Sequence, residues 1–220
     1  MNNTYPEICK KQLGFKNENQ YLKIVKRNIP DNSEFFFQKI SKFLPTIFGF
    51  ISRSNAKKDI LKLFETKIPS ELKNEFLYDF WIQDMSDLCK LFCDFLKDSR
   101  VSFWIGTNRN CSRYHVDMVP FRLLVTYSGQ GTELLPDNAA NRNAFLEGKS
   151  NEFIVKDKTK IKYINNWDIA LFRGGKKGVL HKTPDSAIKN SKSILMRIDS
   201  SSFLEEINKI NRLHQLEVKA

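Results

Sequence analysis

Residues 121–127 read F-R-L-L-V-T-Y, a short run of branched and aromatic residues between Pro120 and the turn sequence S-G-Q-G. A run of this length and composition is typical of a β-strand. Successive residues of a strand project to opposite faces, so Phe121, Leu123, Val125 and Tyr127 share an apolar face that predicts contact with a core. The other face carries Arg122, Leu124 and Thr126, and the notable pair Arg122 and Thr126 looks either into a polar cavity or into solvent.

Similar short runs continue through the second half of the chain. They are V-S-F-W-I-G-T (101–107), N-E-F-I-V-K (151–156), I-K-Y-I (161–164), W-D-I-A-L-F-R (167–173), G-V-L-H (178–181) and S-I-L-M-R-I-D (193–199). Turn sequences such as P-D-N, R-G-G-K-K-G and T-P-D-S separate them. Because most of these runs have no helical pattern between them, the region is predicted to form an antiparallel sandwich or barrel.

The first half of the chain favours helices. The stretch 31–45 begins with capping residues and ends at Pro45, which cannot continue a helix. Ser70 can cap a longer helix that runs to about Lys97, with a break expected near 83–86.

The end of the chain returns to helical spacing and places His214 among charged residues on a surface. The predicted fold class is therefore α+β. We expect a mostly helical segment (1–98) that packs on a strand-rich metal-binding domain (99–200), followed by a C-terminal helix (201–220).

The composition fits a globular protein. Of the 220 residues, 41% are hydrophobic and 12% aromatic, which is enough to fill a core. The formal net charge of +11 is spread over both halves, and its densest clusters are K-D-K-T-K-I-K (156–162) and R-G-G-K-K (173–177). This diffuse excess permits contact with an anionic partner, but ordinary solvated lysines explain it better than a dedicated nucleic-acid face.

The cysteines and the N-terminus bear on location. Cysteines at positions 9, 89, 93 and 111 show neither a C-x-x-C pattern nor a disulfide spacing, so reduced thiols are expected. The N-terminus lacks the basic start and apolar run of a signal peptide, and no window of about 18 residues is apolar enough to span a membrane. We expect a cytoplasmic protein with no membrane partner.

Two of the three histidines lie in the strand-rich half, in R-Y-H-V-D and at the end of G-V-L-H. His115 and Asp117 are two apart, so on an extended segment both side chains project to one side. With His181 they would form a face of two histidines and one carboxylate, the arrangement that holds non-haem Fe(II) in oxygenases. Zinc would accept the same residues, with Cys111 as a further thiolate ligand.

These motifs occur in an ordered series that resembles a known family. In order they are R-Y-H-V-D, R-L-L-V-T-Y, G-Q-G-T-E-L-L-P, W-D-I-A-L-F, G-V-L-H and K-S-I-L-M-R-I-D. The series looks like the double-stranded β-helix, a jelly-roll or cupin-like barrel, of 2-oxoglutarate/Fe(II) dioxygenases of the prolyl 4-hydroxylase-like branch. More closely, C-S-R-Y-H-V-D, T-Y-S-G-Q-G-T-E and L-H-K-T-P resemble the uncharacterised bacterial family named domain of unknown function 1826, which supplies no activity.

The resemblance implies that His115, Asp117 and His181 bind Fe(II). It further implies that 2-oxoglutarate is the cosubstrate of an oxygenase that hydroxylates a C–H bond of a small molecule or peptide.

The resemblance also implies a cation on the strand after His181 for the far carboxylate of 2-oxoglutarate. Lys192 and Arg197 both lie there, on opposite faces of the strand. The residues that share a face with Lys192 are Ile194, Met196 and Ile198. Because a barrel interior is expected to be apolar, Lys192 is the first choice and Arg197 the second.

Three further residues complete the candidate site. Arg122 is a candidate for binding a substrate or cosubstrate carboxylate, since a guanidinium binds carboxylates through two parallel hydrogen bonds. Glu133 is either a carboxylate behind a metal-bound histidine or an exposed turn residue. Tyr127 is expected to pack with its hydroxyl tethered, and it is also a candidate for the substrate pocket.

Three alternatives stay open. A zinc-binding cupin-like protein, for metal handling or sensing without oxidative chemistry, would use Cys111. A nucleic-acid-modifying oxygenase would account for the +11 charge. A degenerate β-helix used for protein contacts would bind no metal. The loops 136–151 and 182–192 are expected to shape the pocket, and the sequence names neither the substrate nor the oligomeric state.

Overall fold

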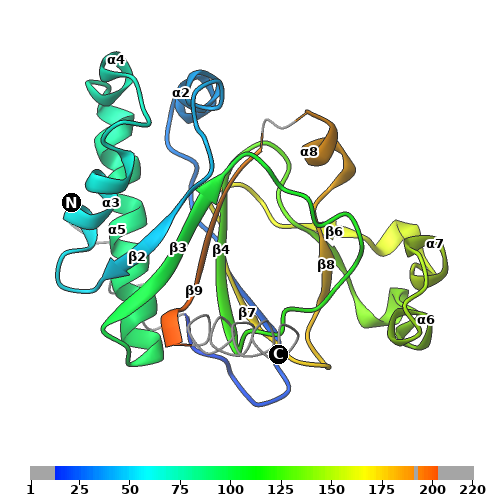
Figure 1. Cartoon of the computed structure of the whole chain (residues 1–220). Coiled ribbons are helices and arrows are strands. Elements are labelled where there is room, and N and C mark those ends of the chain that lie inside the picture. Colours follow the sequence, from blue (N-terminus) through cyan, green and yellow to red (C-terminus); the bar gives the residue numbers. More distant parts are fainter. Residues whose placement is uncertain (1–12, 191–192, 203–220) are drawn as a thin grey trace, which may run out of the picture.

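The computed structural model describes residues 13–190 and 193–202 (Figure 1). Helices and two antiparallel sheets make up the chain, so the predicted α+β class is confirmed. The large sheet contains, in spatial order, β1 (Leu22–Val25), β7 (Ile169–Arg173), β4 (Phe121–Ser128), β9 (Ile194–Ser200), β3 (Arg100–Gly106) and β2 (Ile47–Ser52). The small sheet contains β6 (Lys162–Tyr163), β5 (Glu133–Leu135) and β8 (Leu180–Lys182).

The helices lie in two groups. Those from the first half of the chain are α2 (Ser33–Ile40), α3 (Ala56–Phe64), α4 (Ser70–Lys73) and α5 (Phe76–Leu96). The later ones are α6 (Arg142–Leu146), α7 (Asn151–Ile154) and α8 (Asp185–Asn190), with 3₁₀ turns at Asp137–Ala139 and Lys158–Lys160. Figure 1 shows α3 and α5 beside β2 and β3, and α6 and α7 on the far side of the small sheet.

The two faces of the large sheet have different neighbours. From β9, Ile194, Met196 and Ile198 point into the main hydrophobic core, which they share with Trp81 of α5 and with residues of α2 and α3. Leu195 alternates with them and joins a separate cluster between the two sheets. The members of that cluster are Leu124, Leu134, Ile164, Ala170 and Phe172, with Leu22 and Val179 beside them. The inner space between the sheets is therefore a small apolar cluster that leaves room for polar side chains.

Several sequence expectations need correction. The run 151–156 was expected to be a strand, but its first residues form the short helix α7. Helix α5 continues through 83–86, and the interruption falls instead at Asn74 and Glu75, between α4 and α5. The mostly helical first segment also contributes β1 and β2, the two edge strands of the large sheet.

The expected core thiols are confirmed for Cys89 and Cys93, which are free and buried in α5. Burial raises the pKa of Cys93 to about 11, so the thiol is protonated and unreactive at neutral pH. Cys9, His214 and the C-terminal helix expected for 201–220 lie largely or wholly outside the described residues. Within the described ranges, none of the helices has both the length and the apolar character needed to cross a bilayer.

Candidate metal centre

His115 and His181 face each other across an isolated antiparallel bridge. Each backbone N–H donates to the carbonyl oxygen of the other residue, at 3.0 Å in both directions. Residues opposite each other in such a pair project to the same face. The imidazole rings are accordingly close, with centroids 4.4 Å apart. Because His181 belongs to β8, this bridge adds the segment around His115 to the edge of the small sheet.

Asp117 completes a group in which one ligand atom of each residue lies within 4.8 Å of the others. Its Oδ2 atom is 3.5 Å from Nε2 of His181, and both side chains are buried. The Phe172 ring lies against the His181 ring, with centroids 4.6 Å apart, so the group sits over the face of the large sheet that looks toward the small one. The structure thus brings together all three residues that the sequence nominated.

The backbone fixes the orientation of both imidazoles. Nδ1 of His115 lies 3.1 Å from the carbonyl oxygen of Arg113, and Nδ1 of His181 lies 2.9 Å from that of Val179. A carbonyl oxygen only accepts hydrogen bonds, so each Nδ1 carries the proton and each Nε2 keeps its lone pair. Burial lowers the pKa of His181 to about 4, which leaves the ring neutral at neutral pH, as a metal ligand must be.

The carboxylate of Asp117 has one satisfied and one unsatisfied oxygen. Oδ1 accepts a hydrogen bond from Nη1 of Arg122. Oδ2 is buried and has no hydrogen-bond partner among the described residues. A buried charged oxygen without a partner is costly, and a cation between Oδ2 and the two Nε2 atoms would remove that cost. Two imidazole nitrogens and one carboxylate oxygen suit iron or zinc, so these residues fit a divalent transition metal.

Arg122 holds Asp117 in place. Its Nε and Nη2 atoms donate to the two carboxylate oxygens of Asp199, at 2.7 and 3.0 Å, while Nη1 donates to Asp117. Burial opposes the charge of this guanidinium, but Asp199 and Asp117 outweigh it and raise the pKa of Arg122. The polar face of β4 therefore looks into the site rather than into solvent. The hydrogen bonds expected for an external carboxylate are already made to the protein.

A small cavity of about 60 Å³ adjoins the two histidines. Its lining residues are Arg109, Cys111, His115, Arg122, Leu124, Thr132, His181, Lys182, Thr183, Leu195 and Arg197. They include three arginines and, within the part of the chain that the structure describes, no carboxylate. The volume corresponds to about two water molecules, so an organic ligand requires some lining side chains to move.

Arg109 is the residue that sequence reasoning missed. It is 5% exposed, and it donates from Nη1 to the Ser193 hydroxyl at 2.7 Å and from Nη2 to the Thr132 hydroxyl at 3.1 Å. Among the described residues no carboxylate pairs with it, and its Nε has no partner. Burial lowers the pKa of Arg109 to about 10. Its sequence context, T-N-R-N-C, carries no strand or motif signal, so only the folded chain shows that it lines the cavity.

The choice between Lys192 and Arg197 rested on a wrong premise. The apolar face of β9, expected to look into the barrel, packs against the helices. The opposite face carries Arg197, which lines the cavity and whose Nε lies 3.1 Å from Oδ2 of Asp199. Lys192 itself lies outside the described residues. Of the two candidates, Arg197 is therefore the one that the described residues bring to the cavity.

Cys111 lies at the cavity without joining the ligand group. The residue is exposed, and its backbone carbonyl accepts a hydrogen bond from the Thr183 N–H at 2.8 Å. Its thiol is not among the atoms that converge with those of His115 and His181. A fourth, thiolate ligand is thus not preformed at this site.

Glu133 is buried at 6% exposure, so the exposed-turn interpretation is wrong. Its carboxylate accepts a hydrogen bond from the Tyr114 hydroxyl and lies 3.4 Å from Nζ of Lys182. Tyr114 precedes His115 and Lys182 follows His181 in the chain. Glu133 therefore ties together the neighbours of two candidate ligands, without touching either imidazole in the described structure.

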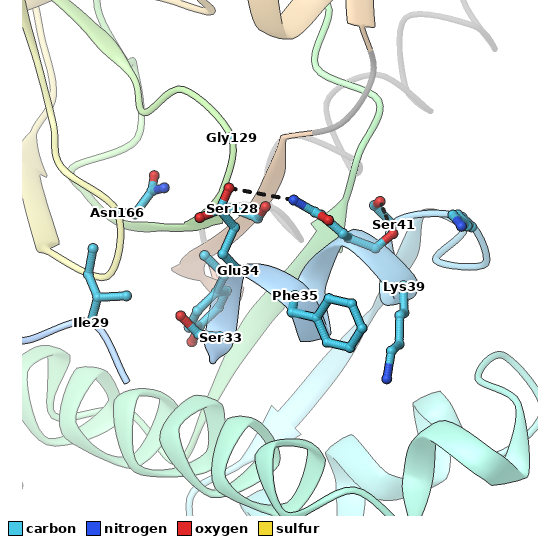
Figure 2. Close-up of a pocket in the computed structure, with 12 residues that line it drawn as sticks. Ile29, Ser33, Glu34, Phe35, Lys39, Ser41, Ser128, Gly129 and Asn166 are labelled. Atoms are coloured by element: carbon cyan, nitrogen blue, oxygen red, sulfur yellow. Dashed lines mark hydrogen bonds between the residues drawn. The ribbon is translucent and has the colours of Figure 1, made fainter. Parts of the chain in front are cut away.

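Tyr127 lies on the other face of β4, in the main core. Its hydroxyl donates to Asp84 at 2.7 Å, which matches the expected tethered hydroxyl. Tyr127 also lines a second, larger cavity of about 790 Å³ beside α2. Figure 2 shows this cavity between Ser33, Glu34 and Phe35 on one side and Ser128, Gly129 and Asn166 on the other. It shares no lining residue with the cavity at the histidines, so the structure does not bring Tyr127 to the candidate metal centre.

The fold and site define an α+β protein with a preformed group of metal-ligand type between two antiparallel sheets. The chain belongs to the family described as protein of unknown function DUF1826, whose model matches residues 15–199. This confirms the closer of the two resemblances seen in the sequence. No match was found among curated proteins.

Solved structures give only distant likenesses. A bsmA homologue from Methylobium petroleophilum PM1 is 13% identical with a TM-score of 0.30, and the match covers 61% of this chain and 54%, about half, of that one. AviO1 from Streptomyces viridochromogenes Tue57 is 9% identical, with a TM-score of 0.34 and coverage of 91% and 97%. EvdO2 from Micromonospora carbonacea var. aurantiaca, complexed with 2-oxoglutarate, is 9% identical, with a TM-score of 0.36 and coverage of 89% and 91%. At such low TM-scores these likenesses carry no argument about this chain.

Proposed function

We propose that this protein is a non-haem Fe(II)-dependent oxygenase that uses 2-oxoglutarate as cosubstrate. One observation carries the proposal: the ligand atoms of His115, Asp117 and His181 converge within 4.8 Å. Both Nδ1 atoms are held by backbone carbonyls, and Oδ2 of Asp117 has no partner among the described residues. Such a face of two histidines and one carboxylate leaves three positions of an octahedral ion open for ligands.

The strand connections support a double-stranded β-helix, with 99–200 as the metal-binding domain. The chain passes from β3 in the large sheet to the segment of His115, which pairs with the small sheet, and back to β4. It then crosses to β5 and β6, returns to β7, crosses to β8 and ends in β9. Repeated crossing between two antiparallel sheets is the pattern of jelly-roll folds.

At such a centre, the metal and the residues of this chain would have different roles. Iron with its cosubstrate would supply the oxidising power, and the protein the geometry and a dry pocket. Arg122 orients Asp117. The apolar side chains of Leu124 and Phe172 exclude water beside the imidazoles. Arg109, a buried cation without a carboxylate among the described residues, is our first candidate to bind the far carboxylate of a 2-oxo diacid, ahead of Arg197.

Anaerobic titration tests this proposal. Adding Fe(II) and then 2-oxoglutarate should produce a weak charge-transfer band in the visible, because the diacid chelates an open iron site. Asp117→Asn should abolish the band, and Cys111→Ser should leave it unchanged, since that thiol lies outside the ligand group. Tight zinc binding without any such band would sink the oxygenase assignment.

Zinc handling or sensing without oxidative chemistry is the second candidate function. The same ligands accept zinc, and Cys111 lines the cavity from which a fourth ligand would come. This candidate requires that zinc affinity fall in Cys111→Ser. Competition with a chromogenic chelator measures it directly.

A further inference from the structure

The site-bearing face of the large sheet extends beyond the candidate metal centre toward β2. Leu124 of β4 lies opposite Arg197 of β9, which lies opposite Trp104 of β3, which lies opposite Phe48 of β2. Opposite residues in an antiparallel pair share a face. These side chains therefore form a row that starts at the cavity, where Leu124 and Arg197 are lining residues, and ends at the edge strand.

A parallel row ends at a second exposed phenylalanine. Asp199 lies opposite Ser102, and Ser102 lies opposite Phe50. Phe48 and Phe50 are 75% and 50% exposed, and Trp104 is half-buried. We call Phe48, Phe50 and Trp104 the aromatic platform. It is not a core face, because the core residues of β3 alternate with Trp104 and point toward the helices; they are Val101, Phe103 and Ile105.

Arginines are interleaved with the platform. The guanidinium carbon of Arg197 lies 5.5 Å from the centre of the Trp104 ring, and that of Arg100 lies 5.1 Å from the Phe50 ring. Arg197 contacts the platform through Trp104 and also lines the cavity. The platform is thus continuous with the candidate metal centre through Arg197, and it belongs to a chain of net charge +11.

We propose that the aromatic platform binds single-stranded nucleic acid and presents it to the candidate metal centre. Every base has a flat π face, so exposed aromatic rings on a sheet bind successive bases, while arginines follow the phosphates. Neighbouring strands are about 4.8 Å apart and alternate residues of one strand about 7 Å apart, which places the three rings within reach of consecutive bases. Delivery to the metal rests on the proposed function; binding at the platform does not.

Other occupants fit the surface less well. Symmetric pairing of two copies through β2 would bring together two chains that each carry a net charge of +11. An extended peptide added to the β2 edge would bind through its backbone, and it would leave the arginine–ring stacks unused. Arginines stacked on exposed rings, in a chain of net charge +11, match a polyanion with flat groups.

Tryptophan fluorescence gives a direct test, because Trp81 and Trp167 are 0% and 2% exposed while Trp104 is half-buried on the platform. Metal-free full-length protein is titrated at low salt with mixed-sequence single strands of about 12 nucleotides, long enough for one binding site. We expect the nucleic acid to quench the fluorescence of Trp104. The logarithm of the affinity should fall linearly with the logarithm of the salt concentration. Trp104→Phe should retain binding, measured by anisotropy of a labelled strand, and lose the quenching.

Phe48→Ala and Phe50→Ala should each weaken binding about tenfold, the loss expected for one stacked base. Phe76→Ala is the matched control, because Phe76 is 81% exposed on α5 and away from the platform. Equal affinity of Phe48→Ala and Phe76→Ala would overturn the proposal, as would binding that does not respond to salt. Two further results would overturn the proposal if no nucleic acid binds. They are self-association that depends on Phe48 and binding of an acidic peptide that depends on Phe48. Because no metal is present, a negative result leaves the proposed iron chemistry standing.

Discussion

The two faces of the large sheet use the same strands for different purposes. On β4, Leu123 and Val125 point into the core beneath the helices, while Arg122 and Leu124 point toward the small sheet and the histidines. Both faces contain buried polar atoms without a partner among the described residues. On the helix side these are the indole N–H groups of Trp81 and Trp167, the Ser86 hydroxyl and Nε of Arg173. On the site side they belong to charged groups.

On the site side, one such atom, Oδ2 of Asp117, converges with ligand atoms of His115 and His181. A buried neutral N–H without a partner costs a few kcal/mol at most, about 1–3, whereas a buried charge without one costs considerably more. The Asp117 carboxylate is paired with Arg122, and Arg109 donates hydrogen bonds through both Nη atoms, but Oδ2 of Asp117 and Nε of Arg109 themselves lack a partner among the described residues. Groups of this kind are retained where a ligand satisfies them.

The largest effect is expected on the helix side. Trp81 packs edge-to-face against Phe37, Phe64 and Tyr127, with ring centroids 5.2, 5.5 and 5.8 Å away. Trp81→Ala should lower the free energy of unfolding by about 3–5 kcal/mol, because it leaves a cavity. Denaturant unfolding measures this loss, and Phe76→Ala, at an exposed position, should show none. The folded fraction of the variant should bind metal as tightly as the wild type. A lower metal affinity of the variant would mean that the two faces of the sheet are not independent.

On the site side, Arg122→Met should lower the free energy of unfolding by about 3 kcal/mol, since it leaves Asp117 buried without its cation. Asp199 keeps Arg197 and limits the loss. Saturating Fe(II) or Zn²⁺ should restore more stability to the variant than to the wild type, because the ion replaces the missing charge. Lys149→Met, which breaks an exposed pair with Glu147, is the control and should cost less than about 1 kcal/mol. Equal metal stabilisation of both proteins would contradict a metal at Asp117.

Arg109→Gln should act on ligand binding rather than on stability. It removes a buried charge that has no carboxylate partner in the described residues, so the free energy of unfolding should stay the same or rise. The affinity of the metal-loaded protein for 2-oxoglutarate should fall about tenfold to a hundredfold, as expected for a lost charged hydrogen bond. Pyruvate lacks the far carboxylate and should bind both proteins equally in calorimetry. A parallel loss of pyruvate affinity would remove Arg109 from the far-carboxylate role.

The smallest effect is expected for Cys111→Ser. The thiol is exposed and outside the ligand group, so metal content and metal affinity should match those of the wild type. Elemental analysis and a chelator competition provide the measurement. A zinc affinity lowered tenfold or more, about 1.4 kcal/mol, would instead favour a zinc site that recruits this thiol.

The sequence predicted the strands and the ligand group where local pattern and chain order suffice. On an extended segment the H-x-D spacing places the side chains of His115 and Asp117 on one side. Strands β3, β4, β7, β8 and β9 fall on the runs that the sequence predicts. The run 151–156 failed because a short apolar stretch fits a strand or one helical turn equally well. Strands β1 and β2 were not predicted, because they lie within a region of helical pattern and pair with strands that are distant in the sequence.

The roles of the cations depended on tertiary structure. Alternation showed that Arg197 and Ile198 lie on opposite faces of β9, but it does not say which face looks into the site. Both faces of the large sheet are covered, one by helices and one in part by the small sheet, so apolar character marks the helix side here. Arg109 lies in a loop, and only the fold brings it beside Ser193 and Thr132.

The central claim is that His115, Asp117 and His181 hold one metal ion. The most direct test is elemental analysis of protein purified without chelators and reconstituted anaerobically with Fe(II), alongside His115→Ala and His181→Ala. We predict about one equivalent of metal per chain in the wild type, as expected for a single facial site, and close to none in either variant. Equal metal content in all three proteins would contradict the assignment.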